Sequence, residues 1–534
     1  MFLMCSGAIY FDFPKHHFGN IFRRFSEKDA DELLGRRAID VSRLPFTELS
    51  QDEVRALLIH CHEHDHADCY FSSPLGLLLF RCQMVLSVSL GWLFESFFIP
   101  GALVANDLRG KTFTDWLETG APACMEAAVR AGRIKPALPR YVQESPAAGA
   151  SATEFWLNYA RTIVLPEILV VSDFLDALLF KSDLTLGQFA DLGNRAFDQL
   201  SERCEIPKQT RWTTTQRDLP LHPRQDSILS TEEIFEYLAL VAEREALVST
   251  RATEAALCKW RMKAAFRSEP YSAGFNLERK SGFPEHLLQA LSSIANIALR
   301  SPIDLCVGTK GEMLVETHHP SWRMRNGYFV IGDTRDCPVS RRTLAERLKY
   351  LGHNLDFATF ETRISRLTSL PQPIVSALAC DIQNVDILGS GLINERYQKS
   401  YPDPRLDPVN SLIEVRERFR AGIGCSMLGK LPTYRPLPLL YYSDYCSLNL
   451  GQSVDAMFKY FGMHGATLGR FLQLSLLSKN VLNVSMAPLD SAFVARLNAI
   501  PGLMTDKIEL AYSWKQAANN AFGPAFSDSL SWWD

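Results

Sequence analysis

Three residues in the first quarter of the chain, His62, Glu63 and His66, have the types and spacing of a metal site on a helix. They form an H-E-x-x-H string with the two histidines four positions apart. On an α-helix this spacing points both imidazoles at one metal ion, one turn apart. Glu63 is left beside the metal, where its carboxylate can take a proton from bound water. The string predicts metal-dependent hydrolysis, with His62 and His66 as ligands and Glu63 as general base.

The histidines lie in a segment whose sequence favours an amphipathic helix, which begins after Ser50 and is broken by the Ser-Ser-Pro triplet at 72–74. Ser50 and Glu53 match the S-x-x-E capping box, in which each side chain accepts a hydrogen bond from the other residue's backbone N–H. Apolar side chains then recur at helical spacing and form one face: Val54, Leu57, Leu58 and Cys61.

The same stretch has a second interpretation without catalysis. His60, His64 and Asp65 add further polarity, so the segment can also be a solvated, histidine-rich helix end. His60 and His64 repeat the four-residue spacing, but Cys61 follows His60 where a catalytic base is needed. The second pair is therefore the poorer catalytic candidate.

The bulk properties of the chain are those of a globular protein large enough for two to four domains. It has 534 residues, of which 47% are hydrophobic and 22% charged, and a formal net charge of −4, so its overall charge does not favour nucleic acid. Its 12 cysteines are scattered without a C-x-x-C pair, which predicts reduced thiols and a cytoplasmic setting. The first residues carry no basic segment before their short apolar run, so we expect no signal peptide.

A long apolar run at residues 75–99 follows the motif and is long enough to span a bilayer. Arg81 and Glu95 interrupt it, and each costs about 2.5–3.5 kcal/mol at a bilayer centre. A helix that is apolar nearly all round can also be the central helix of a large core. We expect the buried helix, with membrane association as the less favoured alternative.

A second helix is predicted at residues 229–247, where Ser230 and Glu233 repeat the capping box. Four residues at helical spacing share one of its faces: Glu236, Ala239, Leu240 and Glu243. A carboxylate followed one turn later by a small residue is what a third ligand on a closely packed helix requires. The alternative is an ordinary amphipathic helix with both glutamates on its solvated side.

Together the two helices resemble the gluzincin metallopeptidases, in which H-E-x-x-H is followed downstream by E-x-x-A-x-x-x-E. The matching residues here are His62, Glu63, His66, Glu236, Ala239 and Glu243. The resemblance implies that His62, His66 and Glu236 bind zinc, Zn2+. It implies that Glu63 activates a zinc-bound water to hydrolyse a peptide bond, and that Glu243 is an outer-shell partner.

Several features depart from that family. The separation of His66 from Glu236 requires a large insertion between the motif helices, Leu240 stands where thermolysin-like enzymes carry an aspartate, and no G-x-M-E-N string precedes the motif. The third ligand therefore has alternatives elsewhere in the first third of the chain: Glu95, Glu118 and Glu154. A group that stabilises the oxyanion is also open among four residues: Tyr237, Tyr271, His318 and His319.

The remaining chain carries weaker signals. We predict helices at 155–204, 283–299 and 341–352, short strands near the N-terminus and at 313–319, 327–333 and 436–442, and a long loop at 205–227. Residues 424–430 imitate a phosphate-binding loop, but Leu431 replaces the Ser/Thr that would hold magnesium, so we reject that site.

The predicted fold is α+β and predominantly helical. Residues 1–254 would form a zincin-like catalytic region, and residues 255–534 a mixed region of unknown role. The predicted function is zinc-dependent peptide hydrolysis with a peptide or protein substrate and no nucleic acid partner. The alternative is a non-catalytic metal-binding or interaction protein that uses the histidine-rich helix.

Overall fold

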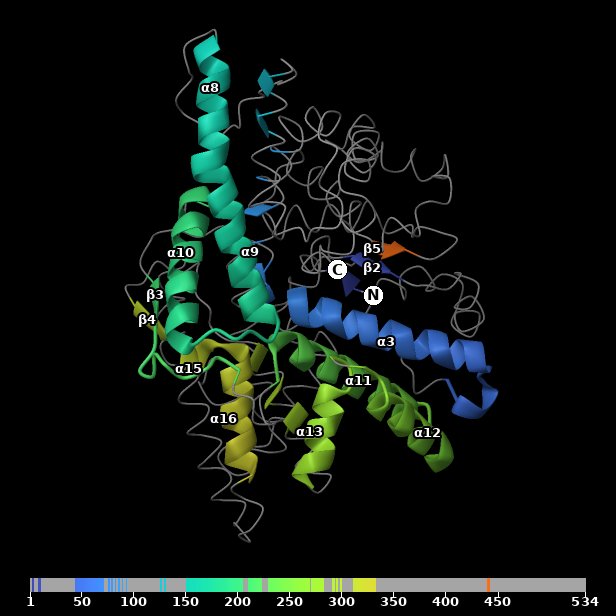
Figure 1. The fold of residues 1–534 in the computed structure, drawn as a ribbon. Coiled ribbons are helices and arrows are strands. Elements are labelled where there is room, and N and C mark those ends of the chain that lie inside the picture. Colours follow the sequence, from blue (N-terminus) through green and yellow to red (C-terminus); the bar gives the residue numbers. More distant parts are fainter. Residues whose placement is uncertain are drawn as a thin grey trace, which may run out of the picture.

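In a computed structural model of the protein, helices dominate and two small sheets accompany them (Figure 1). The structure describes residues 44–71, 150–204, 210–222, 229–268, 270–282 and 311–332, with short pieces at 2–3, 8–10 and 439–441 and scattered positions at 75–93, 125–130 and 291–299. In this part of the chain the prediction of a predominantly helical α+β fold is confirmed.

The predicted motif helix is α3, which spans Gln51–Phe71. Its first turn has the capping box expected from the sequence. The Ser50 backbone N–H donates to Glu53 Oε2 over 2.7 Å, and the Glu53 N–H donates to Ser50 Oγ over 3.2 Å. These bonds satisfy donors that the start of a helix otherwise leaves unpaired. Before α3, Phe46–Glu48 forms a single 3-10 turn, η2.

The second predicted helix is α11, which spans Thr231–Ser249 and has the same reciprocal cap between Ser230 and Glu233. It packs along α3 in the opposite chain direction (Figure 1). At one end the Phe46 backbone N–H donates to the carbonyl oxygen of Thr250 over 2.8 Å, so the start of α3 meets the end of α11.

Buried alanines occur on both helices, and Ala239 shares the face of α11 from which Glu236 and Glu243 contact His62 of α3. Ala239, Ala242 and Ala246 of α11 are buried, as are Ala56 and Leu57 of α3. Short side chains allow two helix backbones to approach closely, because less volume must fit between their axes. The small residue predicted at Ala239 therefore stands where close packing needs it.

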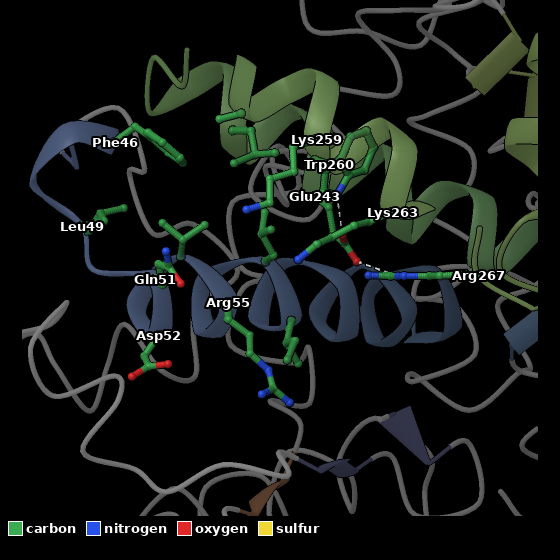
Figure 2. Close-up of a pocket in the computed structure, with 15 residues that line it drawn as sticks. Phe46, Leu49, Gln51, Asp52, Arg55, Glu243, Lys259, Trp260, Lys263 and Arg267 are labelled. Atoms are coloured by element: carbon green, nitrogen blue, oxygen red, sulfur yellow. Dashed lines mark hydrogen bonds and ion pairs between the residues drawn. The ribbon is translucent and has the colours of Figure 1, made fainter. Parts of the chain in front are cut away.

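Two further helices pack on α11. From α12 (Glu254–Ala265), Trp260 Nε1 donates to Glu243 Oε2 over 2.7 Å (Figure 2). From α13 (Ala273–Ser281), Gly274 lies so close to α11 that an added Cβ would be 2.4 Å from the ring of Tyr237.

A second group of helices lies beside this one (Figure 1). It confirms the helical prediction for 155–204 and consists of α8 (Ala150–Tyr159), the π-helical turn η5 (Ala160–Val164), α9 (Leu165–Leu179) and α10 (Leu186–Cys204). Aromatic side chains hold α9 to α10, with the Phe174 ring 5.8 Å from that of Phe189.

The loop predicted at 205–227 is wrong at its centre, where Thr210–Thr213 forms strand β3 and pairs in parallel with β4 (Gly311–Leu314). The side chain of Asn194 on α10 accepts from the Trp212 N–H over 2.7 Å and donates to the Trp212 carbonyl oxygen over 2.9 Å. This strand has four residues and depends on the Asn194 side chain and on a partner strand about 100 residues later. Its local sequence therefore has no pattern that predicts a strand.

The strand predicted at 327–333 is also wrong, because α16 covers Pro320–Gly332. The strand predicted at 313–319 is half right: β4 ends at Leu314 and the short helix α15 follows at Val315–His318. Trp322 fixes α16 by donating from Nε1 to the Leu221 carbonyl oxygen over 2.9 Å, a tertiary contact that overrides the strand pattern.

Short strands occur where we predicted them, near the N-terminus and within 436–442. Strand β1 (Phe2–Leu3) pairs antiparallel with β2 (Ala8–Tyr10), which pairs in parallel with β5 (Leu439–Tyr441). The described positions of the 75–99 run, such as Leu79 and Leu86, are helical and buried, as are those of the predicted helix at 283–299. Among the described residues no helix is both long and apolar enough to cross a bilayer. The predicted helix at 341–352 and the loop at 424–430 lie outside the described residues.

The division of the chain at residues 254 and 255 stays a prediction. The boundary falls within the first turn of α12, which packs against α11. Four cysteines whose side chains the structure describes are free thiols: Cys61, Cys69, Cys82 and Cys258.

Candidate metal centre

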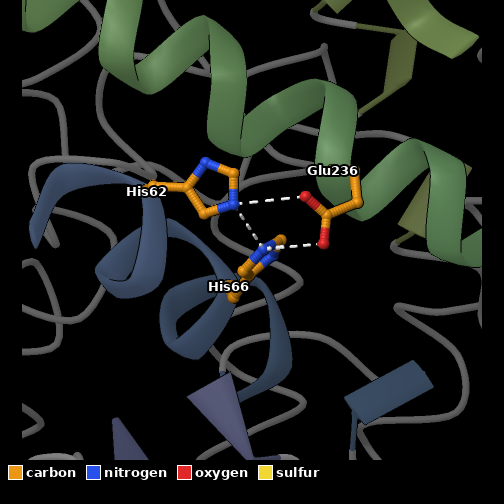
Figure 3. Close-up of side chains that lie close together, drawn as sticks. All are labelled: His62, His66 and Glu236. Carbon is orange, nitrogen blue, oxygen red and sulfur yellow. Dashed lines mark hydrogen bonds and ion pairs between the residues drawn. The ribbon is translucent and has the colours of Figure 1, made fainter. Parts of the chain in front are cut away.

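His62, His66 and Glu236 converge between α3 and α11 (Figure 3). His62 Nε2 lies 3.2 Å from Glu236 Oε2 and 3.2 Å from His66 Nε2, and His66 Nε2 lies 3.3 Å from Glu236 Oε1. The antiparallel packing brings them together, because the motif histidines face the first half of α11. Of the described residues, only this group has three suitable ligand atoms within 4.8 Å of one another.

The separations within this cluster suit a tetrahedral metal ion. Ligand atoms about 2.0–2.1 Å from a tetrahedral centre are about 3.3–3.4 Å apart. Here the two imidazole nitrogens lie 3.2 Å apart, and each lies 3.2–3.3 Å from a different oxygen of the Glu236 carboxylate. Two imidazole nitrogens and one carboxylate are also the protein ligands of a known type of catalytic zinc site, which leaves a fourth position open. The donor set and its spacing therefore fit zinc.

Without a metal, a shared positive charge holds these side chains together. Burial lowers the pKa of His62, but hydrogen bonds to Glu236 and Glu243 outweigh it and raise the pKa to about 10. Burial raises the pKa of Glu236, but the charges of His66 and His62 outweigh it and hold the pKa well below its ordinary value. A metal ion held by these three residues would take the place of that proton as the positive charge.

Glu243 orients His62 from behind. Its Oε1 lies 2.9 Å from Nδ1 of His62, the ring nitrogen that points away from the cluster. Glu243 is 2% exposed and also accepts from Trp260 Nε1 over 2.7 Å and from Arg267 Nη1 over 3.2 Å. A carboxylate on the outer nitrogen of a ligating histidine fixes the tautomer and the ring orientation. Sequence spacing gave no signal for Trp260 or Arg267.

Glu63 lies on the cluster side of α3. It is 9% exposed, and its charge helps to raise the pKa of both His62 and Tyr271. Tyr271 lies with its ring centroid 6.4 Å from that of His62. Burial first, then Glu236 and Glu63, raise the pKa of Tyr271 to about 12, so its hydroxyl keeps its proton near neutral pH.

The other oxyanion candidates lie in different surroundings. Tyr237 is buried and donates from its hydroxyl to Glu278 Oε1 over 2.6 Å, so it ties α11 to α13. His318 Nδ1 lies 3.0 Å from the Leu314 carbonyl oxygen at the end of β4. His319 is fully buried, with its ring 4.9 Å from that of Phe189 on α10. Of the four candidates, Tyr271 alone neighbours the cluster.

Neither Glu154 nor the second histidine pair joins this group. Glu154 is exposed on α8. The other two alternative third ligands, Glu95 and Glu118, lie outside the described residues and stay alternatives. His60 and His64 are buried with ring centroids 4.0 Å apart, and burial lowers the pKa of His60 to about 3. Because these histidines are buried, the interpretation of a solvated helix end is wrong, as is a solvated position for Glu243.

Comparison with known proteins adds no relative. No protein-family model, curated protein sequence or solved structure matches this chain. The resemblance to gluzincins therefore rests on the motif residues themselves, and function has to be argued from the chemistry of the cluster.

Proposed function

We propose that the protein is a zinc-dependent hydrolase of peptide bonds, with His62, His66 and Glu236 as the metal ligands. The observation that carries the proposal is the set of mutual separations of 3.2, 3.2 and 3.3 Å among two imidazole nitrogens and a carboxylate. Zinc in such a site acts as a Lewis acid and lowers the pKa of a coordinated water to about 7.

The surrounding residues have complementary roles in this proposal. Glu63 is the general base, since its carboxylate follows His62 in sequence and lies near both His62 and Tyr271. Tyr271 donates a hydrogen bond to the developing oxyanion, because its ring centroid lies 6.4 Å from that of His62 and its hydroxyl is protonated at neutral pH. Glu243 holds the His62 ring in place through Nδ1.

The peptide substrate and the zincin-like character of the first region come from the motif resemblance. The packing of the capped H-E-x-x-H helix against a second helix that contributes a glutamate is the arrangement that this resemblance requires. On this proposal the segment between α3 and α11 is the large insertion that separates the two motif helices.

Metal analysis and a single substitution test the proposal. The purified full-length protein should carry about one zinc ion per chain. Glu63→Gln should retain that zinc and lower hydrolysis of a mixed peptide library by about 10²–10⁴-fold, because the base is lost and the ligands are not. Glu312→Gln, an exposed change of the same charge on β4, is the control and should leave both values unchanged.

Other outcomes separate the proposal from its alternative. If the protein is a non-catalytic metal-binding protein, the wild type should bind zinc but cleave no peptide. Glu63→Gln should then behave like the wild type in both measurements. Glu236→Ala should lower zinc occupancy, because two histidines alone leave the site with one ligand fewer. Full occupancy in that variant would remove Glu236 as a ligand.

A further inference from the structure

A cavity of about 730 Å³ lies between the N-terminal half of α3, the C-terminal half of α11 and α12 (Figure 2). Its volume falls within the range of about 300–1,000 Å³ typical of sites for small organic ligands. His62, His66 and Glu236 do not line it, whereas Glu243 forms part of its wall. The cavity therefore lies behind the metal centre, on the Nδ1 side of His62, and is a separate site.

One part of the cavity wall is apolar and only half covered by protein. Leu49, Val54, Leu58 and Ile59 line it and are each half-buried. They come from the start of α3 and the turn before it, and the three helical residues share one face. Concave apolar surface that remains in contact with water favours a ligand with a hydrocarbon portion, which releases that water on binding.

The other part of the wall is cationic. Lys259, Lys263 and Arg267 line the cavity from α12 and the residues after it, at intervals of four positions (Figure 2). Arg267 is paired with Glu243. Neither lysine ammonium group forms an ion pair with a residue that the structure describes. The two lysines are one helical turn apart, so both can reach a single anionic group.

We propose that this cavity binds a free single-chain amphiphile with a carboxylate head, such as a fatty acid. The chain lies on the apolar wall of α3, and the head lies at Lys259 and Lys263. Asp52 and Arg55 on the α3 side oppose each other in charge, which leaves the two lysines to set the charge preference of the site. The inference does not depend on zinc chemistry.

Calorimetric titration of the full-length protein tests the proposal with dodecanoate below its micelle-forming concentration. We expect saturable binding of about one dodecanoate per chain. Dodecanol, which has the same chain without the charge, should bind about tenfold more weakly, and butanoate should not bind. Equal affinity for dodecanol and dodecanoate, or no binding of dodecanoate, would overturn the proposal.

Substitutions locate the ligand within the cavity. The double variant Lys259→Gln/Lys263→Gln should weaken dodecanoate binding about tenfold, equivalent to about 1.4 kcal/mol, and leave dodecanol binding unchanged. Leu58→Ala should weaken both probes. Arg261→Gln removes a cation from a different face of α12 and should change neither. Loss of binding in the Arg261 variant equal to that in the lysine variant would indicate general charge attraction and sink the proposal.

Discussion

At the scale of single residues, the contact of Glu243 with His62 has a measurable consequence. Outer-shell partners of ligating histidines typically contribute about 10–100-fold to metal affinity. We predict that Glu243→Gln weakens zinc binding by that factor, because the His62 ring loses the charged partner at Nδ1. Competition with a chromophoric zinc chelator measures the change.

Glu254→Gln is the control for this prediction, since it removes the same charge from an exposed position on α12. Its zinc affinity should equal that of the wild type. An unchanged affinity in Glu243→Gln would contradict the orienting role. Thermal unfolding of the metal-free variants separates lost affinity from lost structure, because Glu243 also accepts from Trp260 and Arg267.

Tyr271 and Tyr237 are equal candidates for the oxyanion donor in the sequence, but the structure predicts different effects of their substitution, one on activity and one on stability. Tyr271→Phe should lower kcat by about 10²-fold with zinc content unchanged, because a donor to the oxyanion is lost. Tyr237→Phe should retain activity and lower the free energy of unfolding by about 1–3 kcal/mol, because the buried Glu278 Oε1 loses the hydrogen bond from the Tyr237 hydroxyl. Peptide hydrolysis and urea unfolding of both variants check the pair. Equal kcat losses in both would contradict the assignment of Tyr271.

At the scale of elements, the two helix caps are the features that local sequence predicts best. Ser230 and Glu233 satisfy each other's backbone donors at distances of 2.8 and 3.2 Å, and α11 begins at the next residue. We predict that Ser230→Ala lowers the free energy of unfolding by about 1 kcal/mol, because the Glu233 backbone N–H loses its acceptor, the Ser230 hydroxyl. The Glu233 carboxylate still accepts from the backbone N–H of residue 230. Ser249→Ala, at the exposed end of the same helix, should have little effect in the same denaturation experiment.

The caps, the helical spacing of His62 and His66 and the small Ala239 could be predicted because each depends on neighbours within one or two turns. Elements that depend on distant partners could not. The strand at Thr210–Thr213 exists through Asn194 and β4, and α16 forms where local residues favour a strand. The packing of α3 against α11 was partly predictable. Each helix could be predicted from its local sequence, but only the motif resemblance predicted that the two would contact each other.

At the scale of the whole molecule, the half-buried His222 and the buried His319 join segments that are far apart in the chain. His222 Nδ1 accepts from the Ser182 backbone N–H over 3.2 Å, after the end of α9, and His222 Nε2 lies 3.3 Å from Ser321 Oγ on α16. Its ring centroid is 5.9 Å from that of His319. Protonation of this junction therefore affects the packing of α9, α10 and α16 together.

The sign of the resulting pH dependence follows from the pKa of His222. Burial lowers that pKa to about 4, whereas an unfolded histidine titrates near 6.5, so between these values the unfolded chain binds more protons than the folded chain. The His222 contribution to stability is complete above pH 6.5 and is lost as the pH falls towards 4. It should amount to about 2 kcal/mol between pH 7 and pH 5.

His222→Asn isolates this contribution, because an asparagine oxygen can accept from the Ser182 N–H but takes up no proton in this range. At pH 7 the variant should be less stable than the wild type, since it loses ring packing. As the pH falls to 5 the difference should shrink by about 2 kcal/mol, which urea unfolding at both values measures. If the stability difference between variant and wild type stays constant with pH, His222 has the same pKa in the folded and unfolded chains. The junction would then not contribute to unfolding in acid.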